Sequence, residues 1–379
     1  MHVTLHLTTG CSMRCSYCYS PPHPGPAMTA ETARQALQLG SADGKGCGVV
    51  FFGGEPLLCL DLISETIAQA HRLEASGAAP FHFKLTTNGL ALDDATLDFC
   101  VRNGIHLGFS CDGVAAAHDR HRRLPDGGPT WHLIEPRLRA LLAEAPYASV
   151  MTTVSPDTAG LLAESTAWLV EDVGARYLIV SLDHSAAWTE ADFEALERSY
   201  ERIARLYVRW TTAERKFYFS PFEIKLSSHI NRHCDRKERC EMAERQLSVA
   251  PDGSLYPCVQ FAGAGDEWHI GHVATGIDEA SRVRIRDLSS AKKPQCEGCA
   301  LEPRCHNTCG CLNHQTTGSL QSVSPVLCRH ERMLFPIADR LGAELYRKRR
   351  PSFLHKHYNS AYPILSVLED QADESGSEP

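Results

Sequence analysis

The sequence predicts an α/β fold in which parallel strands form an open or partial barrel. Apolar segments of strand length occur at 3–9, 48–52, 81–87, 105–110, 148–154 and 176–182. Between them, helical patterns occupy 29–40, 59–76, 92–103, 131–145 and 158–173. This alternation is typical of parallel strands joined by crossover helices. In such folds the functional groups lie in the loops at the carboxyl ends of the strands.

Composition narrows the class of protein. The 379 residues leave room for about two or three domains. A net charge of −8 provides no basic excess to neutralise phosphates, which argues against a nucleic-acid partner. No run reaches the roughly 18 apolar residues of a membrane span, and no secretion signal opens the chain. We therefore predict a cytoplasmic protein, in which 16 cysteines indicate metal binding rather than disulfides.

The first predicted strand runs into a C-x3-C-x2-C motif made by Cys11, Cys15 and Cys18. Three thiolates on one loop can hold a single metal centre. A four-iron cluster held by three cysteines keeps one iron available for another ligand, whereas an electron carrier normally uses four. A zinc site or a redox pair is the alternative, although a closed structural zinc site requires four protein ligands.

The next three predicted strands also end in motifs that suit ligand binding: Gly53-Gly54-Glu55-Pro56, Thr86-Thr87-Asn88-Gly89 and Ser110-Cys111-Asp112-Gly113. Paired glycines let a ligand approach the backbone, and small polar side chains can bond a ribose or a carboxylate. The alternative is that these residues only form turns. In the run His118-Asp-Arg-His-Arg122 an arginine can hold a carboxylate through two bonds, although a solvated basic loop is the commoner explanation.

The second half begins with a predicted helix over 189–213, which carries one apolar face made by Phe193, Leu196, Tyr200, Ile203 and Leu206. From about residue 231 the chain becomes rich in Cys, Gly, Pro and His, with too few aliphatic residues for a large core. Bound metal is therefore expected to supply part of its stability. A further helix is expected near 330–347. The basic run Arg347–Arg350 and the acidic end, 370–379, are expected to be solvated, and the acidic end to be disordered.

Eight cysteines follow a regular spacing in this second half: Cys234-x5-Cys240-x12-Gly253-x4-Cys258, then Cys296-x2-Cys299-x5-Cys305-x3-Cys309, then Cys328. Taken alone, the middle four suit a zinc ribbon. All eight thiolates together are enough for two fully ligated four-iron clusters.

The first half resembles the radical S-adenosylmethionine (SAM) superfamily in its cysteine motif, Gly-Gly-Glu-Pro and Thr-Asn-Gly. The resemblance implies a partial (β/α)6 barrel in which Cys11, Cys15 and Cys18 bind a [4Fe–4S] cluster whose open iron chelates SAM. Reductive cleavage of SAM would give methionine and a 5′-deoxyadenosyl radical that abstracts a substrate hydrogen. The resemblance implies contacts from Gly53, Gly54 and Glu55 to the SAM amino group. It makes Asn88, Ser110 and Arg122 candidates for the SAM carboxylate, and Asp112 for its ribose.

The second half resembles the SPASM domain, the cysteine-rich extension of many radical SAM peptide maturases. The resemblance implies that Cys234, Cys240, Cys258 and Cys309 hold one auxiliary [4Fe–4S] cluster. It gives the other cluster to Cys296, Cys299, Cys305 and Cys328, for three clusters in all. The expected divisions are a barrel over 1–188, a linking helix and bridging segment over 189–230, a SPASM domain over 231–335, and a helix and tail over 336–379.

The layout most closely resembles the anaerobic sulfatase-maturating enzymes, with one departure. That family carries an aspartate directly after the third auxiliary cysteine as the base that deprotonates the substrate. Here Cys258 is followed by Val259, which cannot take a proton, and the nearby Gln260 is no substitute. Formylglycine formation is therefore the alternative. The preferred interpretation is a maturase that forms a C–C, C–S or C–O crosslink or an oxidised residue in a ribosomally made precursor peptide.

Several roles stay open at this point. The resemblance implies an external electron donor such as a flavodoxin or ferredoxin. Because the chain starts at the first strand, we expect leader recognition by a separate protein or by the barrel itself. A small-molecule substrate and a non-catalytic iron–sulfur electron carrier are the remaining alternatives, and the sequence does not identify a catalytic base. Five cysteines lie outside the motifs. We expect Cys47, Cys59 and Cys100 to lie in the core, Cys111 near the SAM site and Cys311 near the auxiliary clusters.

Overall fold

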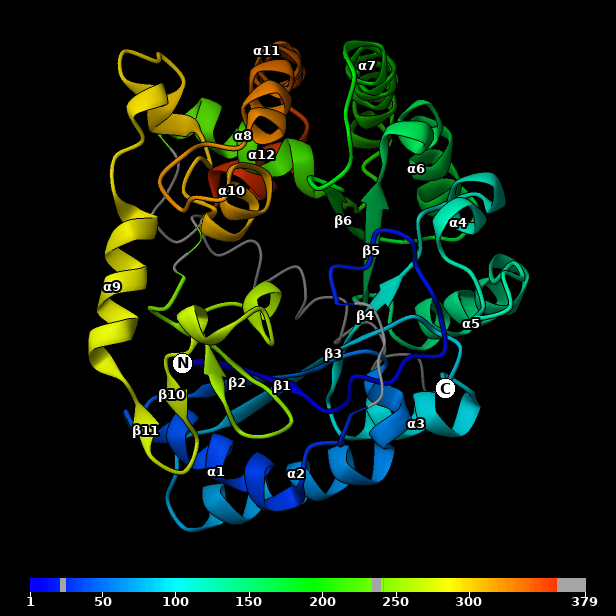
Figure 1. Ribbon diagram of the computed structural model, residues 1–379. Coiled ribbons are helices and arrows are strands. Elements are labelled where there is room, and N and C mark those ends of the chain that lie inside the picture. The colour runs from blue at the N-terminus through cyan, green and yellow to red at the C-terminus, as the bar shows by residue number, and fades with distance from the viewer. Residues whose placement is uncertain (21–24, 234–239, 241, 360–379) are drawn as a thin grey trace.

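The fold is built on one curved sheet flanked by helices (Figure 1). The computed structural model describes residues 1–20, 25–233, 240 and 242–359. Six parallel strands form its centre: β1 (His2–His6), β2 (Cys47–Phe52), β3 (Phe81–Thr87), β4 (His106–Ser110), β5 (Ser149–Val154) and β6 (Tyr177–Leu182). They pair in chain order, so all six carboxyl ends lie at one edge of the sheet. The predicted strand–helix alternation and partial barrel are confirmed.

Helices follow the strands and lie along the outer side of the sheet (Figure 1). Those of the first half are α1 (Ala30–Ser41), α2 (Leu60–Ala75), α3 (Asp94–Arg102), α4 (Ala115–His121), α5 (Trp131–Glu144) and α6 (Leu162–Glu171). Side-chain caps fix where several begin. Thr29 accepts from the N–H of Thr32 at the start of α1, and Asp93 accepts from the N–H of Thr96 at the start of α3. The sequence predicted all of these helices except α4.

The sheet extends beyond the predicted barrel at both edges. β7 (Tyr218–Phe219) pairs with β6, while β8 (Gln246–Val249) pairs in parallel with β1 and carries β9 (Leu255–Tyr256) on its far side. A separate two-stranded sheet joins β10 (Gly271–His272) to β11 (Gly276–Ile277). The cysteine-rich half therefore begins as a continuation of the barrel sheet, at the strand that leads into the Cys11 loop.

The remaining helices of the described residues belong to the second half of the chain. They are α7 (Glu190–Thr212), α8 (Ser220–Asn231), α9 (Glu279–Ser290), α10 (Gly310–Thr317), α11 (Pro325–Lys348) and α12 (Pro351–Tyr358). The sequence predicted α7 and most of α11, which begins five residues earlier than expected because Ser324 caps it. It did not predict the other four. The predictions for Cys234 and for the tail concern residues that the structure does not describe, 234 and 360–379.

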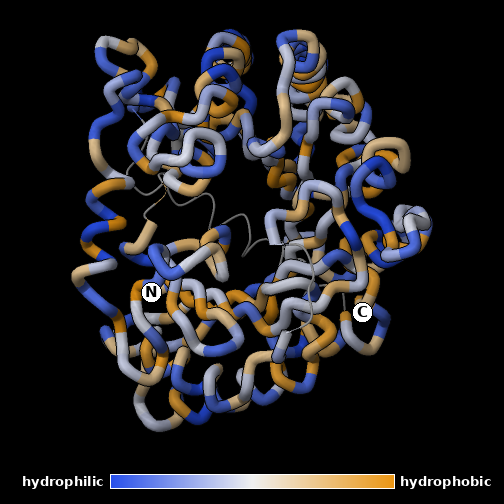
Figure 2. Tube along the Cα trace, viewed as in Figure 1, coloured by the Kyte–Doolittle hydropathy of each residue, from blue (hydrophilic) through white to orange (hydrophobic). Residues whose placement is uncertain are grey.

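One hydrophobic core spans both halves of the chain. Apolar residues gather along the central strands, as Figure 2 shows by colour. Leu247, Val249 and Leu255 of the cysteine-rich half are buried in this core together with Leu5 of β1. The expectation that this half lacks a large core is corrected accordingly, because it packs on the core of the barrel.

The apolar face of α7 is also part of this core, with one correction. Phe193, Leu196, Tyr200 and Ile203 are buried as predicted. Tyr207, rather than Leu206, continues the buried face, because a helical period of 3.6 residues brings Tyr207 under Ile203.

Candidate functional site

The site is organised around the loop that follows β1 and carries Cys11, Cys15 and Cys18. The three thiols are close enough to influence one another electrostatically. The sulfur of Cys11 accepts hydrogen bonds from the N–H of Met13 at 3.4 Å and from Nδ2 of Asn88 at 3.6 Å. Burial raises the pKa of the Cys11 thiol, and these donors act against that shift by favouring the thiolate. This donor set suits a thiolate-bound iron–sulfur cluster.

Backbone bonds to the segment after α4 fix the far side of this loop. The N–H of Arg14 donates to the carbonyl of Arg123 at 2.8 Å, and the N–H of Ser16 donates to the carbonyl of His121 at 3.1 Å. The Ser16 hydroxyl also contacts Nδ1 of His121 at 2.6 Å. The cysteine loop is therefore held from the end of β1 on one side and from the α4 segment on the other.

The Gly53-Gly54 pair lies directly against the start of the cysteine loop. The N–H of Gly54 donates to the carbonyl of Thr8, and the N–H of Glu55 donates to the carbonyl of Gly10. A Cβ on Gly53 would come within 2.4 Å of the Thr8 oxygen, and a Cβ on Gly54 within 2.1 Å of the Gly10 oxygen. Gly53 also has a φ of +128°. Both glycines are thus required for close contact between two backbone segments, in addition to any role toward SAM.

The carboxylate of Glu55 ties this segment to the end of β3. Its oxygens accept from the Thr87 hydroxyl and the Asn88 N–H, both at 2.8 Å, and from the N–H of Leu57 at 3.2 Å. Burial raises the pKa of Glu55 to about 7, against the opposing effect of these three donors. The predicted contact between Glu55 and the SAM amino group stays a prediction. In the structure this carboxylate joins the segment after β2 to the end of β3.

Asn88 links β3 to the cysteine loop directly. Its amide nitrogen donates to the Ser12 hydroxyl at 3.2 Å as well as to Cys11, while its amide oxygen accepts from the N–H of Leu90. Ser110 ends β4 and is half-buried. Both residues lie at the predicted edge of the sheet, and Asn88 touches the cysteine loop.

Asp112 and Arg122, both predicted to contact SAM, form a buried ion pair with one another. Nε of Arg122 donates to Oδ2 of Asp112 at 3.0 Å, and the Tyr17 hydroxyl donates to the same oxygen at 2.5 Å. The other Asp112 oxygen accepts from the N–H of Thr153. Both oxygens of Asp112 thus accept protein hydrogen bonds, and its predicted contact with the SAM ribose stays a prediction. Its observed partner is Arg122, whose guanidinium lies over the Tyr17 ring.

His118 supports this ion pair from beneath. It accepts from the N–H of Asp112 through Nδ1 at 3.3 Å and contacts the Thr130 hydroxyl through Nε2 at 3.1 Å. That hydroxyl in turn donates to the carbonyl of Arg122. Burial lowers the pKa of His118 to about 4, so the imidazole is neutral near pH 7. The basic run that contains Arg122 is therefore partly a buried scaffold, not a solvated loop.

The cysteines of the second half gather into two groups. In the first auxiliary group all the described thiols are free; that of Cys240 is hydrogen-bonded to Cys309, and that of Cys311 is hydrogen-bonded to Cys258. The sulfurs of Cys309 and Cys311 lie 3.5 Å apart. Cys309 thus joins Cys240 and Cys258 instead of its sequence neighbours at 296–305. Cys234, predicted as the fourth member, lies outside the described residues.

The second auxiliary group is arranged around Arg332 of α11. Its guanidinium donates to Cys328 at 3.4 Å and to Cys299 at 3.8 Å. Nδ2 of Asn307 donates to the sulfur of Cys296 at 3.2 Å. Among the described residues, no three Cys, His, Asp or Glu side chains converge on a point that would hold a single metal ion.

A buried ion pair links two helices beside this second group. Nζ of Lys225 lies 2.6 Å from Oε2 of Glu331, and both side chains are almost fully buried. The Cys305 thiol is hydrogen-bonded to Glu331, and burial raises its pKa. Lys225 comes from α8 and Glu331 from α11, so the pair joins α8 to the helix that carries Cys328.

Two side chains connect the barrel mouth to the first auxiliary group. Tyr19, next to Cys18, is an electrostatic neighbour of both Cys18 and Cys258. His184 follows β6 and is a neighbour of Cys309; its Nδ1 is buried with no hydrogen-bond partner among the described residues. The first auxiliary group therefore faces the SAM-loop end of the barrel.

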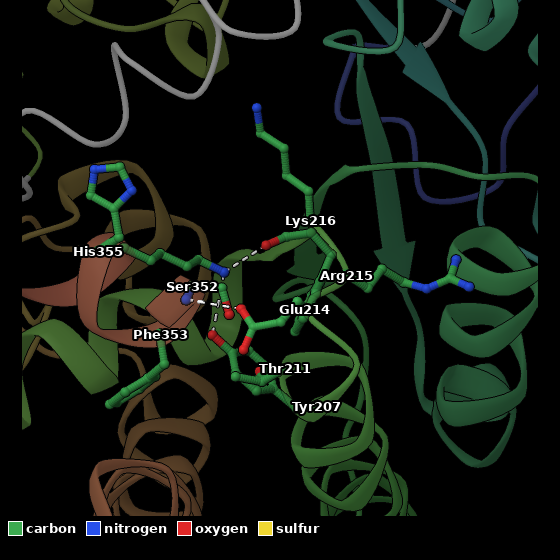
Figure 3. A pocket seen from close by; sticks show the side chains of 10 residues that line it. Tyr207, Thr211, Glu214, Arg215, Lys216, Ser352, Phe353 and His355 are labelled. Atoms are coloured by element: carbon green, nitrogen blue, oxygen red, sulfur yellow. Dashed lines mark hydrogen bonds between the residues drawn. The ribbon is translucent and has the colours of Figure 1, made fainter. Parts of the chain in front are cut away.

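A pocket of about 190 Å³ lies at the opposite edge of the sheet, between the end of α7 and α12 (Figure 3). Nζ of Lys356 donates there to the carbonyl of Phe217 at 2.6 Å and pairs with the buried Glu223. The N–H of Ser352 donates to Glu214. These bonds fasten α12 to the body of the protein, and none of the pocket's lining residues belongs to the site described above.

Comparison with known proteins identifies the domain that carries the Cys11 loop. Residues 5–156 match the model of the radical SAM superfamily. This segment is a radical SAM domain. The [4Fe–4S] cluster and SAM that this superfamily uses fit the three thiols at the end of β1. None of the helices in the described part of the chain has the length and apolar character needed to cross a bilayer.

The proteins similar to this chain include a sulfatase-maturating enzyme. The cysteine-type anaerobic sulfatase-maturating enzyme of Clostridium perfringens is 21% identical over 285 residues, which cover 70% of this chain and 75% of that protein. The structure of native anSMEcpe with bound AdoMet superposes with a TM-score of 0.77 at 18% identity, covering 92% of this chain and 99% of the other.

A second solved structure is more distant. Streptococcus suis SuiB bound to its precursor peptide SuiA gives a TM-score of 0.60 at 13% identity, with coverage of 86% of this chain and 75% of that one. At these identities the likeness establishes the fold: a radical SAM barrel followed by a cysteine-rich region.

Sequence reasoning found the strand-end motifs but missed the groups that support them. Tyr17, His118 and His184 were not assigned roles. Tyr17 lies inside the cysteine motif and His118 inside the basic run, so both were within segments already singled out. Nothing local marks His184, because its proximity to Cys309 arises only when β6 and α10 are brought together.

Proposed function

We propose that this radical SAM enzyme modifies a ribosomally made peptide and leaves a crosslink or an oxidised residue. Bound SAM and a reduced cluster supply the 5′-deoxyadenosyl radical, which takes a hydrogen atom from a side-chain or backbone carbon. The resulting substrate radical then forms a C–C, C–S or C–O bond, with loss of one electron and one proton, or is oxidised directly. The electron needs an acceptor close to the barrel mouth.

The observation that carries this proposal is the position of Tyr19. This side chain is 44% exposed and neighbours both Cys18 of the SAM loop and Cys258 of the first auxiliary group. A substrate at the barrel mouth would lie within reach of both groups. An auxiliary cluster at Cys240, Cys258 and Cys309 would be placed to receive the electron. We propose three [4Fe–4S] clusters, the third held by Cys296, Cys299, Cys305 and Cys328.

Two similarities support a peptide as the substrate. The fold is shared with SuiB bound to precursor peptide SuiA and with native anSMEcpe bound to AdoMet and the Kp18Cys peptide, the latter at a TM-score of 0.77 and 17% identity. By analogy we propose a precursor peptide as partner, an external flavodoxin or ferredoxin as electron donor, and a separate protein or the barrel for leader recognition.

Formylglycine formation is the second candidate, favoured by the similarity to the sulfatase-maturating enzyme. Against it stands Val259, which follows Cys258 where that family carries its aspartate base. Gln260 offers no replacement, because its amide oxygen accepts a hydrogen bond from Gln315 at 2.5 Å. For this reason we rank crosslinking or oxidation of a precursor peptide first.

Anaerobic incubation of the reconstituted protein with SAM and dithionite tests the proposal. We expect 5′-deoxyadenosine, about twelve iron atoms per chain, and a peptide product lighter by two hydrogen atoms. A short open reading frame beside the gene supplies the candidate peptide, and a sulfatase-derived cysteine peptide tests formylglycine formation. Absence of 5′-deoxyadenosine with every substrate would support an electron carrier instead. Turnover of a small molecule alone would reject the peptide.

A further inference from the structure

A line of side-chain hydrogen bonds runs from the cysteine loop to the segment after β5. The Ser16 hydroxyl, inside the cysteine motif, lies 2.6 Å from Nδ1 of His121, the last residue of α4. The other ring nitrogen of His121, Nε2, lies 2.8 Å from Oδ1 of Asp157. Asp157 belongs to the short 3-10 helix Pro156–Leu161, which follows β5. Three segments that are far apart in the chain are therefore joined through one imidazole.

The carboxylate of Asp157 determines the direction of these bonds. Partial burial raises its pKa, but hydrogen bonds from Arg120 and His121 outweigh this effect and keep the pKa below its ordinary value. An ionised carboxylate only accepts, so Nε2 of neutral His121 carries the proton and donates to Asp157. Nδ1 is then the acceptor for the Ser16 hydroxyl. On its other side, Oδ2 of Asp157 accepts from Nε of Arg120 at 2.5 Å.

The imidazole of His121 is the sheltered member of this line. Its side chain is 15% exposed, against 36% for Asp157. The ring lies beside that of Tyr17, with centroids 5.4 Å apart, and the N–H of Ser16 donates to the His121 carbonyl at 3.1 Å. The Tyr17 hydroxyl donates in turn to Asp112. A displacement of His121 would therefore move two neighbouring residues of the cysteine motif together.

We propose that His121 and Asp157 are positioning residues of the SAM site, which act through Ser16 on the part of the cysteine loop that carries Cys15 and Cys18. This part of the loop lies beyond the end of β1, so bonds to other segments fix it instead of strand pairing. Small misplacements at a reacting site lower the rate strongly. The role is geometric, so no covalent bond is made or broken. It concerns the SAM site and does not depend on the proposed peptide substrate.

The test uses full-length protein after anaerobic reconstitution, with SAM as the probe. Asp157→Ala removes the acceptor for Nε2, His121→Ala removes the imidazole, and Ser16→Ala removes the hydroxyl at the other end. Asp98→Ala is the matched control, because it breaks an exposed aspartate–arginine pair on α3. The readouts are iron per chain and the electron paramagnetic resonance spectrum of the dithionite-reduced protein during titration with SAM.

We expect the variants at Ser16, His121 and Asp157 to raise the SAM concentration for half of the spectral change by up to about 10-fold, at unchanged iron content. Asp98→Ala should titrate like wild type. Combining Asp157→Ala with Ser16→Ala should give no more than Ser16→Ala alone, because Asp157 acts through Ser16. A wild-type titration of Asp157→Ala would overturn the proposal. Effects that add in the double variant would overturn it as well, because Asp157 would then act independently of Ser16.

A conservative variant keeps the proposal falsifiable where Ser16→Ala loses its cluster or fails to fold, as judged by iron content and circular dichroism. Ser16 is exposed, so Ser16→Thr adds a methyl group and keeps the hydroxyl donor. It should titrate within about twofold of wild type. A Ser16→Thr titration as weak as that of His121→Ala would overturn the role of the hydroxyl. Failure of the proposed function leaves these outcomes unchanged, because the SAM titration needs no peptide.

Discussion

The loop after β1 holds its three cysteines within eight residues, whereas the auxiliary thiols come from segments up to 88 residues apart between Cys240 and Cys328. Backbone contacts at strand ends fix the first loop, including those that Gly53 and Gly54 permit. Side-chain bonds between helices fix the second region, with the Lys225–Glu331 pair between α8 and α11. The SAM loop should therefore be sensitive to added volume, and the auxiliary region to lost charge pairs.

The largest effect is expected from Glu331→Ala. It leaves the buried Lys225 ammonium without its partner, and loss of one member of such a pair costs about 3–5 kcal/mol. Anaerobic urea unfolding measures the change. Glu344→Ala, which breaks an exposed pair with Lys348, is the control and should cost at most about 1 kcal/mol. Equal effects of the two variants would show that the buried pair does not hold the auxiliary region.

The next effect concerns the pH dependence of the free energy of unfolding, to which the buried His118 contributes. Because burial lowers the pKa of His118 to about 4 in the folded protein, the unfolded chain binds more protons between that value and about 6.5. The stabilisation is complete above pH 6.5 and is lost as pH falls toward 4, by about 3 kcal/mol in total. Unfolding free energies measured across this range should fall less steeply for His118→Gln than for wild type.

Exposed His132 provides the control for that pH series. His132→Gln should leave the wild-type pH dependence unchanged, because its side chain is exposed. A wild-type slope that survives in His118→Gln would mean that another buried group sets the acid sensitivity of the barrel mouth.

Gly54→Ala tests the backbone contact at the SAM loop. The added Cβ meets the Gly10 oxygen at 2.1 Å, so one backbone segment must move. A displacement of this size at a catalytic loop can reduce the rate about 100-fold. The measurement is 5′-deoxyadenosine formation with SAM and dithionite. Gly160→Ala, where a Cβ meets nothing within 4 Å, should retain the wild-type rate. A normal rate in Gly54→Ala would show that the loop tolerates added volume.

The smallest effect is expected from Asn88→Ala. It removes donors to the Ser12 hydroxyl and the Cys11 sulfur, a loss of about 1 kcal/mol. Fewer hydrogen bonds to a cluster sulfur should make the reduction potential of the SAM cluster more negative, measured by redox titration. Asn103→Ala, which loses a bond to the Phe99 carbonyl after α3, is the control. An unshifted potential would show that the hydrogen bond from Asn88 to Cys11 does not influence the SAM cluster.

Local sequence was enough to predict the barrel and the position of its site. Strands β1–β6 are short apolar runs bounded by turn residues, and each parallel pairing follows from the helix between them. Because the carboxyl ends of parallel strands share one edge, Cys11, Gly54 and Asn88 were expected together, and they are in contact or close to it. The predicted SAM contacts, including that of Asp112 with the ribose, stay predictions; in the structure the Asp112 oxygens accept hydrogen bonds from Arg122, Tyr17 and Thr153.

The sequence by itself therefore determined the barrel, the thiol loop at its mouth and the presence of a second cysteine-rich region. These depend on periodicity and on residues close together in the chain. Only the tertiary structure decided that β8 extends the barrel sheet, that His118 supports Asp112, and that Cys311 lies beside Cys309 and Cys258. Such contacts depend on how distant helices pack, and no local pattern encodes them. The Cys11 loop can thus be predicted as a metal site from eight residues, whereas the contacts among the auxiliary cysteines can be identified only in the folded structure.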